Sequence, residues 1–149
     1  MKIIIDGDAC PGISIIEKTA EYYNIPVIIF CDINHFIRSD YSTVRIVDSG
    51  FQSVDMYVAN ETRKNDIVIS QDYGVAAICL SKKAAVMNPK GYIYNESNID
   101  RLLEERHISQ KIRKGGGKTH NNPKKRTAED DKMLERNLIF LIEKFIWSL

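Results

Sequence analysis

A short apolar run near the start of the chain places the strongest constraint on the fold. Residues 2–8 read Lys-Ile-Ile-Ile-Asp-Gly-Asp, a pattern typical of a buried strand, and the chain breaks directly afterwards at Cys10-Pro11-Gly12. Similar short runs recur at residues 27–31, 43–47, 66–70, 84–87 and 92–94. Apolar residues at helical spacing lie between several of them, over residues 13–23, 53–64 and 74–83. This alternation predicts a three-layer α/β/α sandwich with a mainly parallel sheet.

Length and composition favour one compact domain over residues 1–149. The chain is 44% hydrophobic, which is enough to form a sizeable core. No apolar run approaches the roughly 20 residues that a membrane span needs, and no basic segment followed by an apolar signal core is present, so we expect a cytoplasmic protein. The three cysteines lack a Cys-x-x-Cys spacing, and neither a disulfide framework nor a zinc site is expected.

Acidic residues follow the predicted strands. Asp6 and Asp8 close the first strand, and residues two apart on an extended segment point to the same side. Asp72 follows the run at 66–70, and Asp55 lies in the first turn of a predicted helix. The carboxyl ends of parallel strands meet at one edge of a sheet, so we expect these four acids to converge. The alternatives are local: Asp72 would cap the next helix, and the helix dipole would favour Asp55.

Two bare carboxylates about 5 Å apart repel by about 3 kcal/mol at an effective dielectric of roughly 20, so a cation, a basic partner or a bound proton is needed. Oxygen ligands select Mg²⁺ or Mn²⁺, and these metals support phosphate-ester hydrolysis by activated water. We therefore predict a metal site at Asp6, Asp8 and Asp72, with Asp55 beside it. Cys10 is interpreted as a packing residue, and the histidines, His35 among them, show no metal-ligand spacing.

Charge is divided unevenly along the chain. Residues 1–100 carry 9 Lys and Arg against 13 Asp and Glu, and residues 101–149 carry 12 against 7. A flexible basic loop is predicted over residues 111–126, where Gly115-Gly116-Gly117 interrupts a segment with no acid. Its basic residues are candidates for binding nucleic-acid phosphates, with a solvated linker as the alternative. These are Lys111, Arg113, Lys114, Lys118, Lys124, Lys125 and Arg126.

Two helices are predicted to close the chain, each beginning with a capping box. The boxes are Ser97-Asn98-Ile99-Asp100 and Thr127-Ala128-Glu129-Asp130. The last helix, over residues 127–147, ends in a strongly apolar stretch. We expect that stretch to dock on the sheet or on a second copy of the chain, which would make a homo-oligomer.

The sequence resembles the uncharacterised bacterial YaiI/YqxD family over nearly its whole length, through four separated motifs. These motifs are Asp6-Gly7-Asp8-Ala9-Cys10-Pro11, Asp66-Ile67-Val68-Ile69-Ser70-Gln71-Asp72-Tyr73-Gly74, Asn98-Ile99-Asp100-Arg101-Leu102-Leu103 and Pro123-Lys124-Lys125-Arg126-Thr127-Ala128-Glu129-Asp130. The family's first motif usually reads Asp-Ala-Asp-Ala-Cys-Pro-Val, so Gly7 and Gly12 depart from it. Further along the chain, Asn122 stands where a glycine is usual in the family.

The resemblance implies a fold similar to the PIN-like nucleases, whose acids at strand ends hold divalent metal. Carried over residue by residue, the resemblance implies that Asp6 and Asp72 are the main metal ligands and that Asp8 is an additional ligand or an orienting acid. The mid-chain helical acid of that pattern falls on Asp55, with Glu61 as a rival.

Three functions follow from these observations. The first is a Mg²⁺- or Mn²⁺-dependent phosphodiesterase acting on RNA. The second is a non-catalytic module with a PIN-like fold that binds nucleic acid or a protein partner. The third is a phosphatase of the haloacid-dehalogenase type, with Asp6 as nucleophile and Asp8 as acid, although that motif expects Thr or Val where Cys10 stands.

Overall fold

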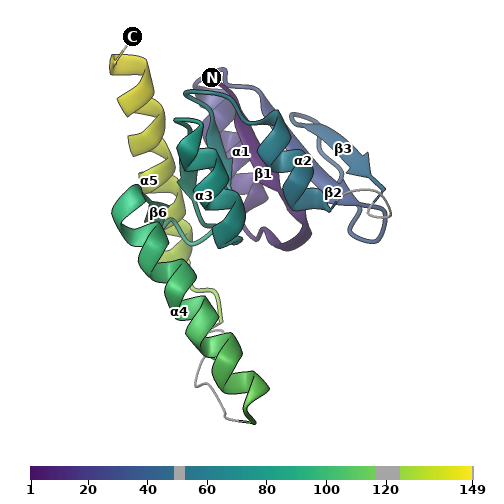
Figure 1. Ribbon diagram of the computed structural model, residues 1–149. Helices are drawn as coiled ribbons and strands as arrows, with labels where there is room; N and C mark the ends of the chain where they lie inside the picture. Colours follow the sequence, from purple (N-terminus) through teal and green to yellow (C-terminus); the bar gives the residue numbers. More distant parts are fainter. Residues whose placement is uncertain (49–52, 117–124, 149) are drawn as a thin grey trace.

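A mainly parallel six-stranded sheet forms the centre of the protein. The computed structural model describes residues 1–48, 53–116 and 125–148 (Figure 1). In sequence order the strands are β1 (Ile3–Asp6), β2 (Val27–Asp32), β3 (Thr43–Val47), β4 (Ile67–Ile69), β5 (Ala85–Met87) and β6 (Ile93–Tyr94). Their order in the sheet is β3-β2-β1-β4-β5-β6, and among these described strands only β6 pairs antiparallel, with β5. The predicted mainly parallel sheet is confirmed.

Helices cover both faces of this sheet, as predicted for a three-layer sandwich. They are α1 (Ile13–Tyr22), α2 (Val54–Glu61), α3 (Tyr73–Ser81), α4 (Glu96–Lys114) and α5 (Ala128–Trp147), with a short 3-10 helix η1 (Gly7–Ala9). In β1, Ile3 and Ile5 belong to the core cluster that includes α1 and α5, whereas Ile4 belongs to the cluster that includes α2 and α3. All three isoleucines are fully buried. Each contributes roughly 1.5–3 kcal/mol by burial, which explains why the run forms a central strand.

The first strand is shorter than predicted. Extended backbone ends at Asp6, and residues Gly7–Ala9 turn in η1, so Asp8 does not lie on extended backbone as expected. Gly7 permits this tight turn, because a Cβ atom at this position would lie 2.7 Å from the backbone oxygen of Phe30. Asp6 and Asp8 still line one cleft, although a turn rather than strand alternation brings them together.

The start and end of α4 both differ from the prediction. The helix begins at Glu96, one residue before Ser97, which was the predicted cap. Asn95 performs the capping instead, since its Oδ1 accepts from the Asn98 backbone N–H at 2.8 Å and the Asn98 side chain accepts from the Asn95 N–H. The helix continues to Lys114, so the predicted loop at residues 111–126 begins too early. Basic residues in a last helical turn are favoured by the helix dipole.

The last helix begins where its capping box predicts. Thr127 accepts from the Asp130 backbone N–H, and Asp130 accepts from the Thr127 N–H in return. The buried face of α5 packs on the sheet and carries Leu134, Leu138, Leu141 and Ile142. Phe140 and Trp147 remain 57% and 82% exposed, and association of two copies through them stays a prediction. Among the described residues, no helix is long and apolar enough to cross a membrane.

Candidate functional site

The candidate site lies where the strand order reverses. From β1 the chain builds outward through β2 and β3, and it then returns to place β4 on the other side of β1. In open α/β sheets the crevice at the carboxyl ends of two such strands is the usual ligand position. Asp6 is the last residue of β1, and Asp72 follows β4. A cleft of about 280 Å³ opens there, and its lining includes the four acids Asp6, Asp8, Asp55 and Asp72.

Asp6 is held at the floor of this cleft by two hydrogen bonds. Its Oδ1 accepts from the Asp8 backbone N–H at 3.5 Å, and its Oδ2 accepts from the Ser70 hydroxyl at 3.3 Å. Burial raises the pKa of Asp6 above its usual value, and the charges of Asp8 and Asp55 add to that rise. Ser70 is 1% exposed and was not among the predicted site residues. Ser70 stands at the carboxyl end of the 66–70 run. The rule that selected the acids, that polar residues at the carboxyl ends of parallel strands meet at one edge of the sheet (the strand-end rule), would also have selected Ser70.

Asp72 has a structural role and a place in the cleft. Its Oδ1 accepts from the Val75 backbone N–H at 3.0 Å, so it is the N-cap of α3. Its own backbone N–H donates to the Ser70 hydroxyl at 3.0 Å. Ser70 therefore connects Asp6 and Asp72 directly. The capping role expected from sequence exists, and it leaves Asp72 lining the same cleft as Asp6.

The structure separates Asp55 from its rival Glu61. Asp55 lies in the first turn of α2 and lines the cleft, and its charge acts on Asp6. Glu61, near the other end of the same helix, pairs with Arg45 at 3.2 Å. The arrangement therefore favours Asp55 as the mid-chain acid of the site.

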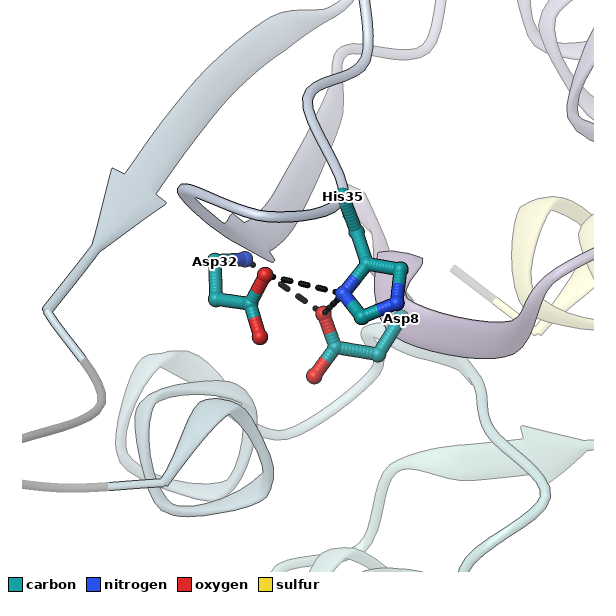
Figure 2. Close-up of side chains that lie close together, drawn as sticks. All are labelled: Asp8, Asp32 and His35. Atoms are coloured by element: carbon teal, nitrogen blue, oxygen red, sulfur yellow. Dashed lines mark hydrogen bonds and ion pairs between the residues drawn. The ribbon is translucent and has the colours of Figure 1, made fainter.

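A histidine and a further acid extend the cluster next to Asp8 (Figure 2). The Nδ1 atom of His35 lies 2.8 Å from Oδ1 of Asp32 and 3.9 Å from Oδ1 of Asp8. The Asp32 backbone N–H also donates to Asp8 at 3.3 Å. One ligand atom from each of these three side chains lies within 4.8 Å of the others, so they are also a possible cation-binding group.

This group was not predicted from the sequence, where His35 shows no metal-ligand spacing. Asp32 is the last residue of β2, so the strand-end rule would have found it. The hydrogen bond to Asp32 raises the pKa of His35 above its usual value, and the same contact lowers the pKa of Asp32. His35 supplies a positive charge to one side of the cleft when it is protonated.

The centre of the cleft has little positive charge to balance its acids. Within the described ranges, no lysine or arginine forms an ion pair with Asp6, Asp8, Asp55 or Asp72. Arg106 of α4 lines an adjoining cleft together with Asp6 and Asp72 but pairs with neither. Four hard oxygen-bearing side chains in an open, partly solvated cleft fit the donor preference of Mg²⁺ and Mn²⁺.

Cys10 takes no part in this charge balance. It packs against the core cluster that contains α1 and α5. Burial raises the pKa of the Cys10 thiol to about 12, so the residue is protonated and unreactive at neutral pH. This agrees with its interpretation as a packing residue.

The predicted basic residues divide into three groups. Lys111, Lys114 and Lys125 are exposed. Arg126 is directed inward, since its Nε donates to Asp131 and its Nη1 donates to the Pro89 carbonyl, both at 2.8 Å. Its guanidinium therefore anchors the start of α5. Lys118 and Lys124, together with the Arg113 side chain, lie outside the described part of the chain.

Comparison with known proteins identifies relatives along almost the full length. The family model described as the uncharacterised YaiI/YqxD family matches residues 4–144. A UPF0178 protein of Clostridium tetani is 62% identical over 144 residues, covering 97% of this chain and 98% of the relative. One from Clostridium kluyveri is 63% identical over 142 residues (95% and 93%), and one from Clostridium acetobutylicum is 46% identical over 136 residues (91% and 92%). No solved structure matches the chain.

Proposed function

The chain belongs to the uncharacterised YaiI/YqxD family, whose membership fixes no activity, and we propose from its acidic cleft that it is a divalent-metal-dependent phosphodiesterase acting on RNA. The observation that carries this proposal is the convergence of Asp6, Asp8, Asp55 and Asp72 in one cleft with no lysine or arginine paired to them among the described residues. Mutual repulsion makes this arrangement costly unless a cation enters.

Mg²⁺ or Mn²⁺ is the cation that these oxygen donors suit, with Asp6, Asp8 and Asp72 as its ligands. When bound, such an ion supplies a Lewis acid that activates water and polarises a phosphoryl oxygen. The protein's own contribution is orientation. The Ser70 hydroxyl donates a hydrogen bond to the Asp6 carboxylate and accepts one from the Asp72 backbone N–H. Asp6 and Asp72, the two ligands, are therefore positioned before any ion binds.

A polyanionic substrate is supported by the charge of the surrounding elements. Exposed Lys111 and Lys114 lie in the last turns of α4, and exposed Lys125 precedes α5. These cations are suited to phosphates along a nucleic-acid backbone, whereas the cleft itself is acidic. The PIN-like nuclease fold that the family resemblance implies agrees with this division of charge, and RNA is the substrate that we propose.

The test is a calorimetric titration of Mn²⁺ and Mg²⁺ into wild type and Asp6→Asn, followed by incubation of both proteins with labelled single-stranded RNA. Asp40→Asn is the matched control, because Asp40 is an exposed aspartate away from the cleft lining. We expect saturable binding and cleavage in wild type and in Asp40→Asn, and loss of both in Asp6→Asn. Cleavage that persists in Asp6→Asn, or that resists removal of metal by a chelator, would refute the proposal.

Two other functions predict different outcomes of the same experiment. RNA binding that is salt-sensitive but independent of metal, without cleavage, would identify a binding module that uses the basic residues alone. A phosphatase would acquire a covalent phosphate on Asp6, which mass spectrometry detects. Among the described residues, the cleft lining contains no lysine to stabilise such an intermediate.

A further inference from the structure

Arg106 occupies an unusual position on α4. Ile99 is buried, and Leu102 and Leu103 pack against the same core cluster. Arg106 follows at the next position of this i, i+3, i+4, i+7 stripe, which is the face that α4 turns toward the body of the protein. The C-terminal part of α4 extends past the sheet (Figure 1). Arg106 is an exposed residue that follows the last core-packing leucine of α4, and it lines a cleft.

The cleft beside Arg106 adjoins the four acids of the candidate site. It has a volume of about 290 Å³ and is lined by Asp6, Gln71, Asp72, Tyr73 and Arg106. Three of these residues, Asp6, Gln71 and Asp72, also line the four-acid cleft, so the two clefts adjoin. The volume is close to the lower limit, about 300 Å³, of pockets that bind small organic ligands.

Arg106 does not use this position to neutralise the acids. Its guanidinium has no carboxylate within 4.0 Å in the described part of the chain, although Asp6 and Asp72 line the same cleft. An arginine beside carboxylates ordinarily closes to a short bidentate ion pair. The gap left here has acids on one side and a guanidinium on the other. An anion bound together with a cation fits that gap, with the cation on the acids and the anion on Arg106.

Tyr73 is an aromatic residue that lines the same cleft and also packs against the core cluster that includes α2 and α3. It is the first residue of α3, directly after the Asp72 cap, and it is half-buried. Its ring meets the ring of Tyr94 edge-on, with centroids 5.9 Å apart, which fixes its orientation. Aromatic rings next to a cationic group are the usual means of holding an unpaired nucleobase and its phosphate.

We propose that Arg106 and Tyr73 form a subsite for one nucleotide of a single-stranded nucleic acid, with its phosphate on Arg106 and its base against Tyr73. The identity of the substrate rests on the proposed function, whereas the phosphate contact does not require turnover. The subsite holds the phosphodiester beside the acids, so it sets substrate affinity and position.

The phosphate contact is tested by fluorescence anisotropy of a labelled ten-nucleotide single-stranded RNA, with Ca²⁺ present and across a series of salt concentrations. We expect Arg106→Gln to weaken binding about 5- to 10-fold and to reduce the salt slope by about 0.7, the value for one lost phosphate contact with a single strand. Arg101→Gln is the matched control, since Arg101 is exposed, lies on the same helix and is outside the cleft lining. It should change neither quantity.

The aromatic contact is tested with a pair of variants in the same assay. Tyr73→Phe keeps the ring and should retain affinity, whereas Tyr73→Leu should weaken binding at least 5-fold, by the loss of one stacking contact. Circular dichroism tests whether Tyr73→Leu is folded. If Tyr73→Leu does not fold, the affinity of Tyr73→Phe decides the test. A large loss of affinity in Tyr73→Phe would overturn the stacking role.

The outcomes separate this inference from the proposed function. If wild type cleaves RNA with Mn²⁺ but Arg106→Gln and Arg101→Gln bind with equal affinity and equal salt slopes, the subsite is wrong and the nuclease stands. If wild type cleaves nothing, yet Arg106→Gln lowers affinity and salt slope and Arg101→Gln does not, the subsite stands and the nuclease is wrong.

Discussion

Substitutions of Asp72 can separate the structural role of this residue from a role in metal binding. As the N-cap of α3, Asp72 accepts from the Val75 N–H at 3.0 Å, and an asparagine oxygen can accept the same hydrogen bond. Asp72→Asn therefore keeps the cap and removes the charge, whereas Asp72→Ala removes both. If capping were the whole function of this residue, Asp72→Asn would behave as wild type in every assay.

The expected magnitudes follow from the two contributions. Loss of the cap in Asp72→Ala costs about 1 kcal/mol relative to Asp72→Asn. In Asp72→Asn, removal of one charge relieves repulsion of about 1 kcal/mol, taking roughly 7 Å between carboxylates and an effective dielectric between about 20 and 80. A weaker interaction with the helix dipole offsets about 0.3–1 kcal/mol of that gain. Without metal, Asp72→Asn should thus lie within about 1 kcal/mol of wild type.

With metal, wild type should become clearly more stable than both variants. At a metal concentration of about 100 times its Kd, wild type gains about 2.7 kcal/mol, and both variants should lose most of that gain. For a chain of this size the gain corresponds to a rise in Tm of roughly 5–10 °C. Thermal and urea denaturation with a chelator and then with Mn²⁺ measures all the differences. A wild-type response of Asp72→Asn to Mn²⁺ would refute the metal role, and equal stability of the two variants without metal would refute the capping argument.

Three further predictions concern the surrounding structure. Gly91→Ala should cost about 2 kcal/mol or more in urea denaturation, because Gly91 has a φ of +89° and an added Cβ would lie 2.6 Å from the backbone of α5. The pKa of His35, measured by NMR, should lie above its ordinary value, and Asp32→Asn should lower that pKa. The stability that this pair contributes is present below the pKa of His35 in the unfolded chain, and it is lost as the pH rises through the pKa of His35 in the folded protein. Lys2→Met should cost about 3 kcal/mol, since it removes the ammonium 2.7 Å from a buried Asp66 carboxylate; a loss below about 1 kcal/mol in urea denaturation would contradict this.

The sequence predicted those parts of the fold that depend on interactions between residues close together in the chain. The isoleucine run became a central strand because all three side chains are buried, and the Thr127 box began α5 because both its hydrogen bonds close within four residues. The length of α4 was not visible, since a polar helix that projects from the core carries little apolar periodicity beyond Leu103. The end of β1 was misplaced because the Gly7 turn depends on contact with Phe30, which belongs to another strand.

Strand order explains why the sequence predicted the four acids but not the groups that flank them. Apolar runs in the sequence show where each strand ends, but they do not show which strands lie next to each other in the sheet. In the sheet, Asp6 is level with Phe30, and Asp8 and Asp32 each lie two residues further along the chain, which brings the Asp8 carboxylate beside the Asp32 backbone N–H. His35 lies beside Asp8 and Asp32 on the β2 side, and Arg106 lines the adjoining cleft from α4. Within the described residues the positive groups thus flank the acids, while Asp6, Asp55 and Asp72 between them have no ion-pair partner. A divalent cation placed there would balance the central charge and leave Arg106 available for the substrate.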